Sequence, residues 1–251
     1  MRAAQRHVVR IGDIVTLESP DLGFISTSGV GASMRADLLE EAVHMPPNIR
    51  ECCYQVYPVF RYAGLEALRK LQSEGQAHGS KKQALLQTVQ ADEQHNRREF
   101  ESLFGTEVRY GMVIQLMHLS THKFITVSHA IAKLERDCLR VSVEPGEEGS
   151  CWTIMPIFKF QRSGDALQYQ DNFYFEAAGK RGFMHISDSS DLSAVCLSSY
   201  IKDTFEVNCS HAQSRLRFRP YRECRAHAAR ESQRGGPGAQ LFGDDVVTIQ
   251  M

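Results

Sequence analysis

The sequence contains no run of about 18 consecutive apolar residues, the length that a bilayer-spanning helix needs. No segment is therefore expected to cross a membrane as a helix. The first residues, Met1 to His7, also lack the apolar stretch of a secretory signal. The formal net charge of −1 gives no overall attraction to nucleic acid or to an anionic membrane. With 42% hydrophobic and 24% charged residues, the composition is typical of a soluble globular protein.

The cysteines form no pattern that predicts disulfides. Their number, seven, is odd, two of them are adjacent, and no secretory signal is evident, so a disulfide framework is not expected. We expect buried or partly buried thiols in a reducing compartment, and hence a chain on the cytosolic side of membranes. The cysteines are Cys52, Cys53, Cys138, Cys151, Cys196, Cys209 and Cys224.

Motifs for catalysis, phosphate binding and metal coordination are also missing. Gly29-Val30-Gly31 has neither the spacing nor the lysine of a P-loop, and no nucleophile elbow or ordered triad is present. Cys209 and His211, with Cys224 and His227 further on, lack the close, regular pairs of a structural zinc site. We therefore predict no catalytic residue, no cofactor and no metal, and the chain is not expected to be an enzyme.

What the sequence does contain is a pattern written three times. Each copy has a large apolar residue, a spacer, a second apolar residue, a spacer and a proline. This alternation places both apolar side chains on one face of a strand that the proline ends. The copies are Tyr54–Pro58, Trp152–Pro156 and Leu216–Pro220, within units Gly12–Pro58, Gly111–Pro156 and Gly164–Pro220. One core built from three related units of about 45–55 residues is therefore expected, which is typical of a scaffold rather than a reaction centre.

Short apolar runs separated by turn residues predict β-hairpins within the units. In the first unit, Ile11–Leu17 and Gly23–Thr27 flank a turn at Ser19–Asp21, where proline presets φ and aspartate bonds its own backbone. Tyr110–Leu116 and Lys123–Val127 repeat this plan in the second unit. Hairpins at such regular intervals indicate a mainly β fold, a closed barrel of short strands.

A segment of different composition, about residues 62–104, separates the first two units. Leucines recur at helical spacing in its first part, and residues 80–103 are rich in good helix formers. Gly79-Ser80 supplies a stop and an N-cap between the two helices. The second helix is polar in its middle, at Asp92–Arg97, and such a helix is poorly suited to burial. We expect a helix-turn-helix arm that projects from the barrel, with a lid over the barrel as the alternative.

The composition changes again after Pro220. Residues 224–241 are charged and then rich in glycine, as expected of a linker. Phe242–Ile249 is a near copy of Ile11–Leu17. We therefore expect residues 1–223 to form one β domain, and residues 242–251 to be the first strand of a second, truncated domain of the same kind.

Several of these segments match one known family in order and in spacing. They are Ile11–Ile14, Gly23–Thr27, Tyr110–Leu119, Glu148–Ser150, Trp152, Pro156, Lys159, Gly164-Asp165 and Val207–Cys209. The sequence resembles the amino-terminal region of the inositol trisphosphate receptors, with the ryanodine receptors as more distant relatives. The likeness extends over about residues 8–221, which makes it specific.

The resemblance implies a β-trefoil with a helix-turn-helix arm between its first and second units, called the suppressor domain. Such a domain packs against the ligand-binding core of the same chain and against a neighbouring subunit of a tetrameric calcium-release channel. It tunes the affinity of that core for inositol trisphosphate on the cytosolic face of the endoplasmic reticulum. The resemblance implies no inositol phosphate site here, because the basic residues that clasp the phosphates would lie beyond Met251.

Two groups of residues are candidates for these domain and subunit contacts. Phe158 takes the place of a tyrosine that in the family reaches toward a neighbouring subunit, so Phe158–Arg162, which includes Lys159, is a candidate docking loop. A buried strand end is the alternative for this segment. Arg215, Arg217 and Arg219 alternate with apolar residues and should face outward together. They form either a solvated strand face or a basic stripe for an acidic surface.

A stand-alone trefoil binding module, lectin-like or protein-interacting, is the alternative function. Sugar-binding trefoils of the ricin type carry a Gln-x-Trp signature in each unit. This sequence has a single tryptophan, Trp152, which Ser150-Cys151 precedes, so that signature is missing. Nucleic acid is not an expected partner either, because no aromatic platform is interleaved with the basic residues.

Overall fold

The structure is a computed structural model of the chain, and it describes residues 8–30, 32–37, 48–74, 79–187 and 205–221. The predicted linker (224–241) and the predicted strand of a second domain (242–251) lie outside these residues. In the described ranges, no helix has the length and apolar character of a membrane span.

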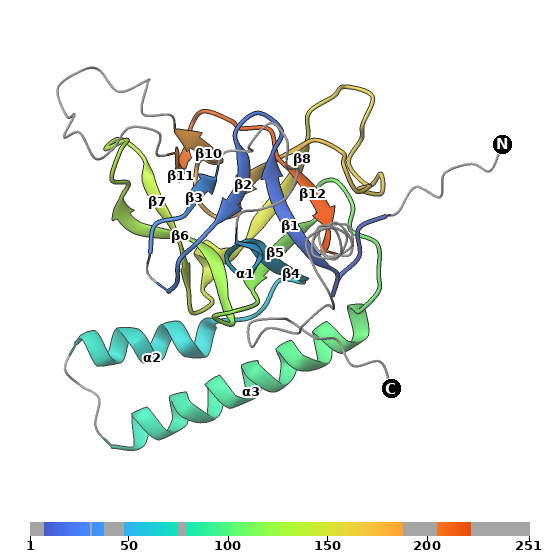
Figure 1. The fold of residues 1–251 in the computed structure, drawn as a ribbon. Helices are drawn as coiled ribbons and strands as arrows, with labels where there is room; N and C mark the ends of the chain where they lie inside the picture. The colour runs from blue at the N-terminus through green and yellow to red at the C-terminus, as the bar shows by residue number, and fades with distance from the viewer. Residues whose placement is uncertain (1–7, 31, 38–47, 75–78, 188–204, 222–251) are drawn as a thin grey trace, which may run out of the picture.

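Twelve short strands form the body of the described chain, and they fall into three consecutive sets of four (Figure 1). The first set is β1 (Ile14–Ser19), β2 (Gly23–Ser26), β3 (Arg35–Asp37) and β4 (Cys53–Tyr57). The second set is β5 (Val113–His118), β6 (Lys123–Ile131), β7 (Leu139–Glu144) and β8 (Trp152–Pro156). The third set is β9 (Phe173–Ala177), β10 (Phe183–Ser187), β11 (Phe205–Ser210) and β12 (Arg217–Pro220).

The strands pair into a closed barrel. Nine of them follow one another in the order β10, β9, β8, β5, β4, β1, β2, β3 and β11, and the pairing of β11 with β10 closes the ring. Of the others, β12 pairs with β1, β6 pairs with β5 and β7, and β7 pairs with β11. The mainly β fold and the closed barrel predicted from the hairpin signals are thus confirmed.

The three copies of the repeated pattern provide a large part of the core. They lie at the last strand of each set, and both apolar positions of every copy have no exposed surface. Two of the large residues also make a buried hydrogen bond. The Tyr54 hydroxyl donates to the carbonyl of Ile25 at 3.0 Å, and Nε1 of Trp152 donates to the carbonyl of Ile125 at 3.0 Å. Equivalent places in two sets therefore satisfy a buried polar group in the same way.

A closed triangle of backbone hydrogen bonds joins the segments that precede the three sets. The amide of Val9 donates to the carbonyl of Leu167 at 2.9 Å, and the amide of Leu167 donates to the carbonyl of Val108 at 2.8 Å. The amide of Val108 completes the triangle by donating to the carbonyl of Val9 at 2.8 Å. All three side chains are completely buried. The core is therefore arranged in a threefold manner at this level.

The prediction that Gly164 opens the third unit is wrong. The amides of Gly12 and Gly111 each donate, at 2.8 Å, to the backbone carbonyl of the second apolar residue of their repeat copy, Val56 or Ile154. In the third set this bond comes from Gln170, which donates to the Phe218 carbonyl at 3.1 Å. Gln170 has φ of +70°, in the same left-handed region as Gly12 at +94°. A search for glycine misses this position, because residues other than glycine seldom adopt positive φ.

Four helices accompany the strands in the described ranges. The short α1 (Ile49–Cys52) precedes β4, and the one-turn η1 (Glu148–Ser150) precedes β8. Two longer helices, α2 (Ala63–Ser73) and α3 (Ser80–Leu103), lie between β4 and β5 and are called the helix pair below. Figure 1 shows them side by side across one end of the barrel. Gly79, rather than the predicted Ser80, is the N-cap of α3, without a side-chain cap.

The polar middle of α3 is the part that binds the segment leading into α2 of the same chain. Asn96 is buried, and its Oδ1 accepts the amide of Arg61 at 2.8 Å while its Nδ2 donates to the Arg61 carbonyl at 2.9 Å. One carboxylate oxygen of Asp92 accepts the amide of Gly64 at 2.9 Å, near the start of α2. The prediction that this polar stretch is unsuited to burial is therefore wrong at Asn96, because backbone groups satisfy both ends of the Asn96 side-chain amide.

Candidate interaction site

The loop after β8, residues 157–162, carries two exposed aromatic side chains and is called the aromatic loop below. Phe158 is 43% exposed and Phe160 is 76% exposed. Their rings stack, with centroids 5.2 Å apart and an interplanar angle of 8°. Lys159 between them is exposed as well. The alternative of a buried strand end therefore does not apply to Phe158.

Gln161 anchors the aromatic loop to the barrel. Its backbone amide donates to the carbonyl of Phe158 at 3.0 Å, and Nε2 of its side chain donates to the hydroxyl of Tyr110 at 2.8 Å. Tyr110 is buried and its hydroxyl lies 3.4 Å from a carboxylate oxygen of Asp171. Burial, with the nearby carboxylates, raises the pKa of Tyr110, so the phenol stays protonated. Sequence reasoning placed Gln161 in the candidate loop but did not identify it as the anchor, because no local pattern distinguishes it from other loop glutamines.

The three arginines of the predicted basic stripe pair with acidic residues of this same chain. Nη2 of Arg215 lies 2.5 Å from a carboxylate oxygen of Asp21. Arg217 donates from Nε to Glu18 at 2.8 Å, and Nε of Arg219 lies 2.5 Å from the other oxygen of Glu18. Glu18 itself has no exposed surface. These contacts follow from the antiparallel pairing of β12 with β1.

The exposure of the stripe is correspondingly uneven. The side chain of Arg215 is 48% exposed, whereas those of Arg217 and Arg219 are 25% and 18% exposed. The expectation that all three guanidinium groups face outward together therefore describes Arg215 only. The other two cover a buried carboxylate, and burying an unpaired carboxylate would be costly.

The cysteines in the described part of the chain are buried free thiols. Burial raises the pKa of Cys151 and that of Cys209 to about 11. Thiols with such pKa values stay protonated at neutral pH and are therefore poor nucleophiles. Among the described residues, no three His, Cys, Asp or Glu side chains are grouped as metal ligands. Cys224 and His227, considered above for zinc, lie outside the described residues.

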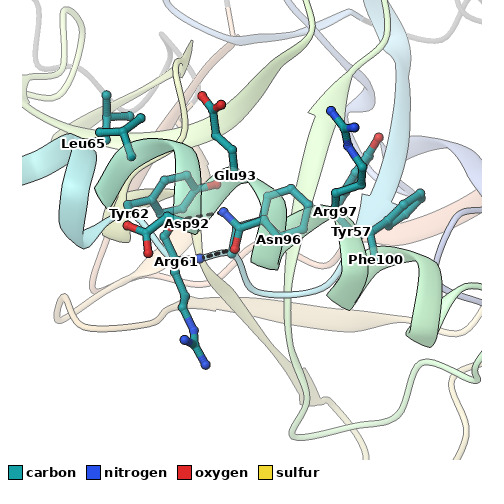
Figure 2. A pocket seen from close by; sticks show the side chains of 11 residues that line it. Tyr57, Arg61, Tyr62, Leu65, Asp92, Glu93, Asn96, Arg97 and Phe100 are labelled. Carbon is teal, nitrogen blue, oxygen red and sulfur yellow. Dashed lines mark hydrogen bonds between the residues drawn. The ribbon is translucent and has the colours of Figure 1, made fainter. Parts of the chain in front are cut away.

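A cavity of about 350 Å³ lies between the helix pair and the barrel (Figure 2). Its lining comes from the end of β4, the chain that leads into α2, and both long helices. Sequence reasoning missed this cavity, because its walls come from segments whose relative placement no local pattern predicts. The lining residues are Tyr57, Phe60, Arg61, Tyr62, Leu65, Val89, Asp92, Glu93, Asn96, Arg97 and Phe100.

These features define a class of protein: a mainly β domain with a closed barrel and a helix pair. The sequence pattern of the inositol 1,4,5-trisphosphate/ryanodine receptor family matches residues 4–227, and the chain belongs to this family. It is a family of receptors and not of enzymes. The inositol 1,4,5-trisphosphate receptor itr-1 of Caenorhabditis elegans is 28% identical over 218 residues, which cover 80% of this chain. That match spans only 8% of the receptor's length. The resemblance seen in the sequence is thus confirmed.

Proposed function

We propose that this chain is a regulatory β-trefoil domain of an inositol trisphosphate-gated calcium-release channel, with the helix pair as its arm. It faces the cytosol at the endoplasmic reticulum and tunes ligand affinity through contacts with the ligand-binding core and a neighbouring subunit. Membership of the receptor family supports this proposal. The three sets of four strands and the hydrogen-bond triangle support the trefoil architecture.

The stacked pair of Phe158 and Phe160 is the observation that carries the proposal. The aromatic residues at the apolar positions of the repeat copies are buried, whereas these two rings are exposed on a loop that Gln161 fixes. Exposed aromatic residues on an ordered loop are typical anchors of a protein interface. Because the rings already stack, few side-chain conformations remain to be lost when a partner binds.

The arginines on β12 form a second proposed contact. Three guanidinium groups face two carboxylates, Glu18 and Asp21, so this edge keeps a surplus of one positive charge. Arg215 is the most exposed of the three and could reach an acidic partner surface. Such an exposed charge contact contributes more to orientation and association rate than to affinity.

Regulation requires that the domain binds the ligand-binding core differently in its free and ligand-bound states. Only such a difference in contact free energy can shift the equilibrium between two states. Allosteric couplings are typically about 1–3 kcal/mol, which corresponds to roughly 5–150-fold in affinity. A small interface centred on an aromatic pair can supply a difference of this size.

The test compares inositol trisphosphate binding by a receptor ligand-binding core alone and by the same core joined behind this chain. We expect weaker binding by the joined protein, by a factor within the roughly 5–150-fold range of allosteric couplings. Isothermal titration calorimetry measures both constants. Equal affinity with and without this chain would contradict the proposal.

Replacing both rings, Phe158→Ala with Phe160→Ala, should restore most of the lost affinity in the joined protein. The free energy of unfolding should change by no more than about 0.5 kcal/mol, because both side chains are exposed. Leu86→Ala on α3 is the control, since Leu86 is 41% exposed and lies far along the chain from the aromatic loop. Undiminished suppression in the double variant would exclude the aromatic loop as the contact.

A further inference from the structure

The cavity between the helix pair and the barrel plays no part in the proposed function. Its volume of about 350 Å³ is more than twice that of an engineered apolar cavity of about 150 Å³ that binds benzene. Most of its wall is apolar. The apolar side chains are the rings of Tyr57, Phe60, Tyr62 and Phe100 and the aliphatic groups of Leu65 and Val89.

Hydrogen bonds and a close backbone contact fix the walls in place. Both ends of the Asn96 amide bond the backbone of Arg61, which ties α3 to the chain that enters α2. The hydroxyl of Tyr62 donates to Gln115 on β5 at 3.1 Å. A Cβ atom at Gly64 would lie 2.8 Å from a backbone nitrogen of α3, so the helices are already at closest approach there. The cavity is therefore a built feature, and its walls are held in place.

The net charge of the side chains that line the cavity is zero. Arg61 and Arg97 oppose Asp92 and Glu93. Asp92 is bonded to the amide of Gly64. Glu93 and Arg97 lie one turn apart on α3 and point to the same side in Figure 2, whereas the Arg61 side chain points the other way. The positive and negative groups of the lining balance one another, so the cavity gives a charged ligand no net attraction to offset its lost hydration.

We propose that this cavity binds an uncharged, mainly apolar small molecule with two or three aromatic rings. The ring faces and edges of the wall suit offset or edge-to-face contacts with an aromatic ligand. A volume above 300 Å³ with mostly apolar lining is typical of small-molecule sites. A molecule bound here touches α2, α3 and the end of β4 together.

Two probes with the same rings and different charge test this site. N-phenyl-1-naphthylamine is uncharged, and 8-anilinonaphthalene-1-sulfonate adds a sulfonate to the same rings. Fluorescence titration of the full chain should show one saturable site for the uncharged probe. The sulfonate should bind at least about tenfold more weakly, because a lining with no net charge gives it no net attraction to offset its lost hydration. Absence of binding, or tighter binding of the sulfonate, would refute the proposal.

Variants that fill the cavity locate the bound probe. Val89→Phe from α3 and Leu65→Phe from α2 should each weaken binding of the uncharged probe at least about tenfold. Leu86→Phe is the matched control, because Leu86 is on α3, is 41% exposed and does not line the cavity. Near-ultraviolet circular dichroism shows which variants keep the native fold, and two filling variants keep the test open if one unfolds. Unchanged binding in a folded filling variant would place the probe elsewhere.

Discussion

At the scale of single residues, His118 shows how burial determines a protonation state. It ends β5 and is 2% exposed, with Nε2 at 2.9 Å from the Arg50 carbonyl and Nδ1 at 3.1 Å from the Thr121 hydroxyl. A carbonyl only accepts, so Nε2 carries the proton and Nδ1 accepts from Thr121. Burial lowers the pKa of His118, against the smaller opposing effects of the Arg50 carbonyl and Glu51.

This lowered pKa makes part of the stability depend on pH. The unfolded chain binds a proton at His118 near pH 6.5, before the folded chain does, so the free energy of unfolding falls as pH drops below about 6.5. His118→Gln should reduce the loss of stability between pH 7 and pH 5, measured by urea unfolding. His129→Gln, at an exposed site on β6, is the control and should leave the pH dependence unchanged. An unaltered slope in His118→Gln would show that another group is responsible.

At the scale of elements, the packing of α2 against α3 depends on Gly64. Its Cβ, if present, would lie 2.8 Å from the Val89 amide nitrogen and 3.0 Å from Asp92. Gly64→Ala should therefore push the helices apart and lower the free energy of unfolding by about 1–3 kcal/mol. Chemical denaturation measures this change. Gln72→Ala, at an exposed position of α2, should change it by no more than about 0.5 kcal/mol. Equal effects of the two substitutions would contradict this account of the helix contact.

The elements that local patterns predicted are those whose side chains alternate regularly or recur at helical spacing. The hairpins β1–β2 and β5–β6 and both long helices belong to this group. The strand β11 escaped prediction because Glu206 and Asn208 interrupt its apolar pattern, although both are buried. Glu206 accepts the amides of Lys133 and Leu134, at 2.8 Å and 2.7 Å. Such long-range partners make a buried polar residue possible, and no local pattern reveals them.

The same reason explains which parts of the candidate site were predictable. The aromatic loop was proposed from Phe158 and the family resemblance, and its exposure is visible only in the structure. The acidic partners of the arginine stripe, Glu18 and Asp21, come from about two hundred residues away, so the partial neutralisation of the stripe could not be foreseen. The cavity likewise depends on how the helix pair lies against the barrel.

At the scale of the whole molecule, the hydrogen-bond triangle of Val9, Val108 and Leu167 joins three distant parts of the chain. Each bond joins two of these three segments, so no segment can leave the triangle without breaking two of the three bonds. The three hydrogen bonds should therefore open only with global unfolding. Native-state hydrogen exchange should give them similar, high protection. The amides of residues 84–90 in α3 should exchange faster, since most of the side chains there are exposed. Faster exchange at Val9 than at the other two would show that its segment opens independently.

The pairing of β12 with β1 also determines how the molecule responds to mechanical force. Their ladder runs from Val15 opposite Pro220 to Glu18 opposite Arg217, so β1 starts where β12 stops. A pull on the chain at these neighbouring points would separate the two strands pair by pair, beginning at Val15 and Pro220. The carboxylate of Glu18, which pairs with Arg217 and Arg219, lies at the opposite end of this ladder. Its ion pairs would therefore be the last contacts between the two strands to break under tension.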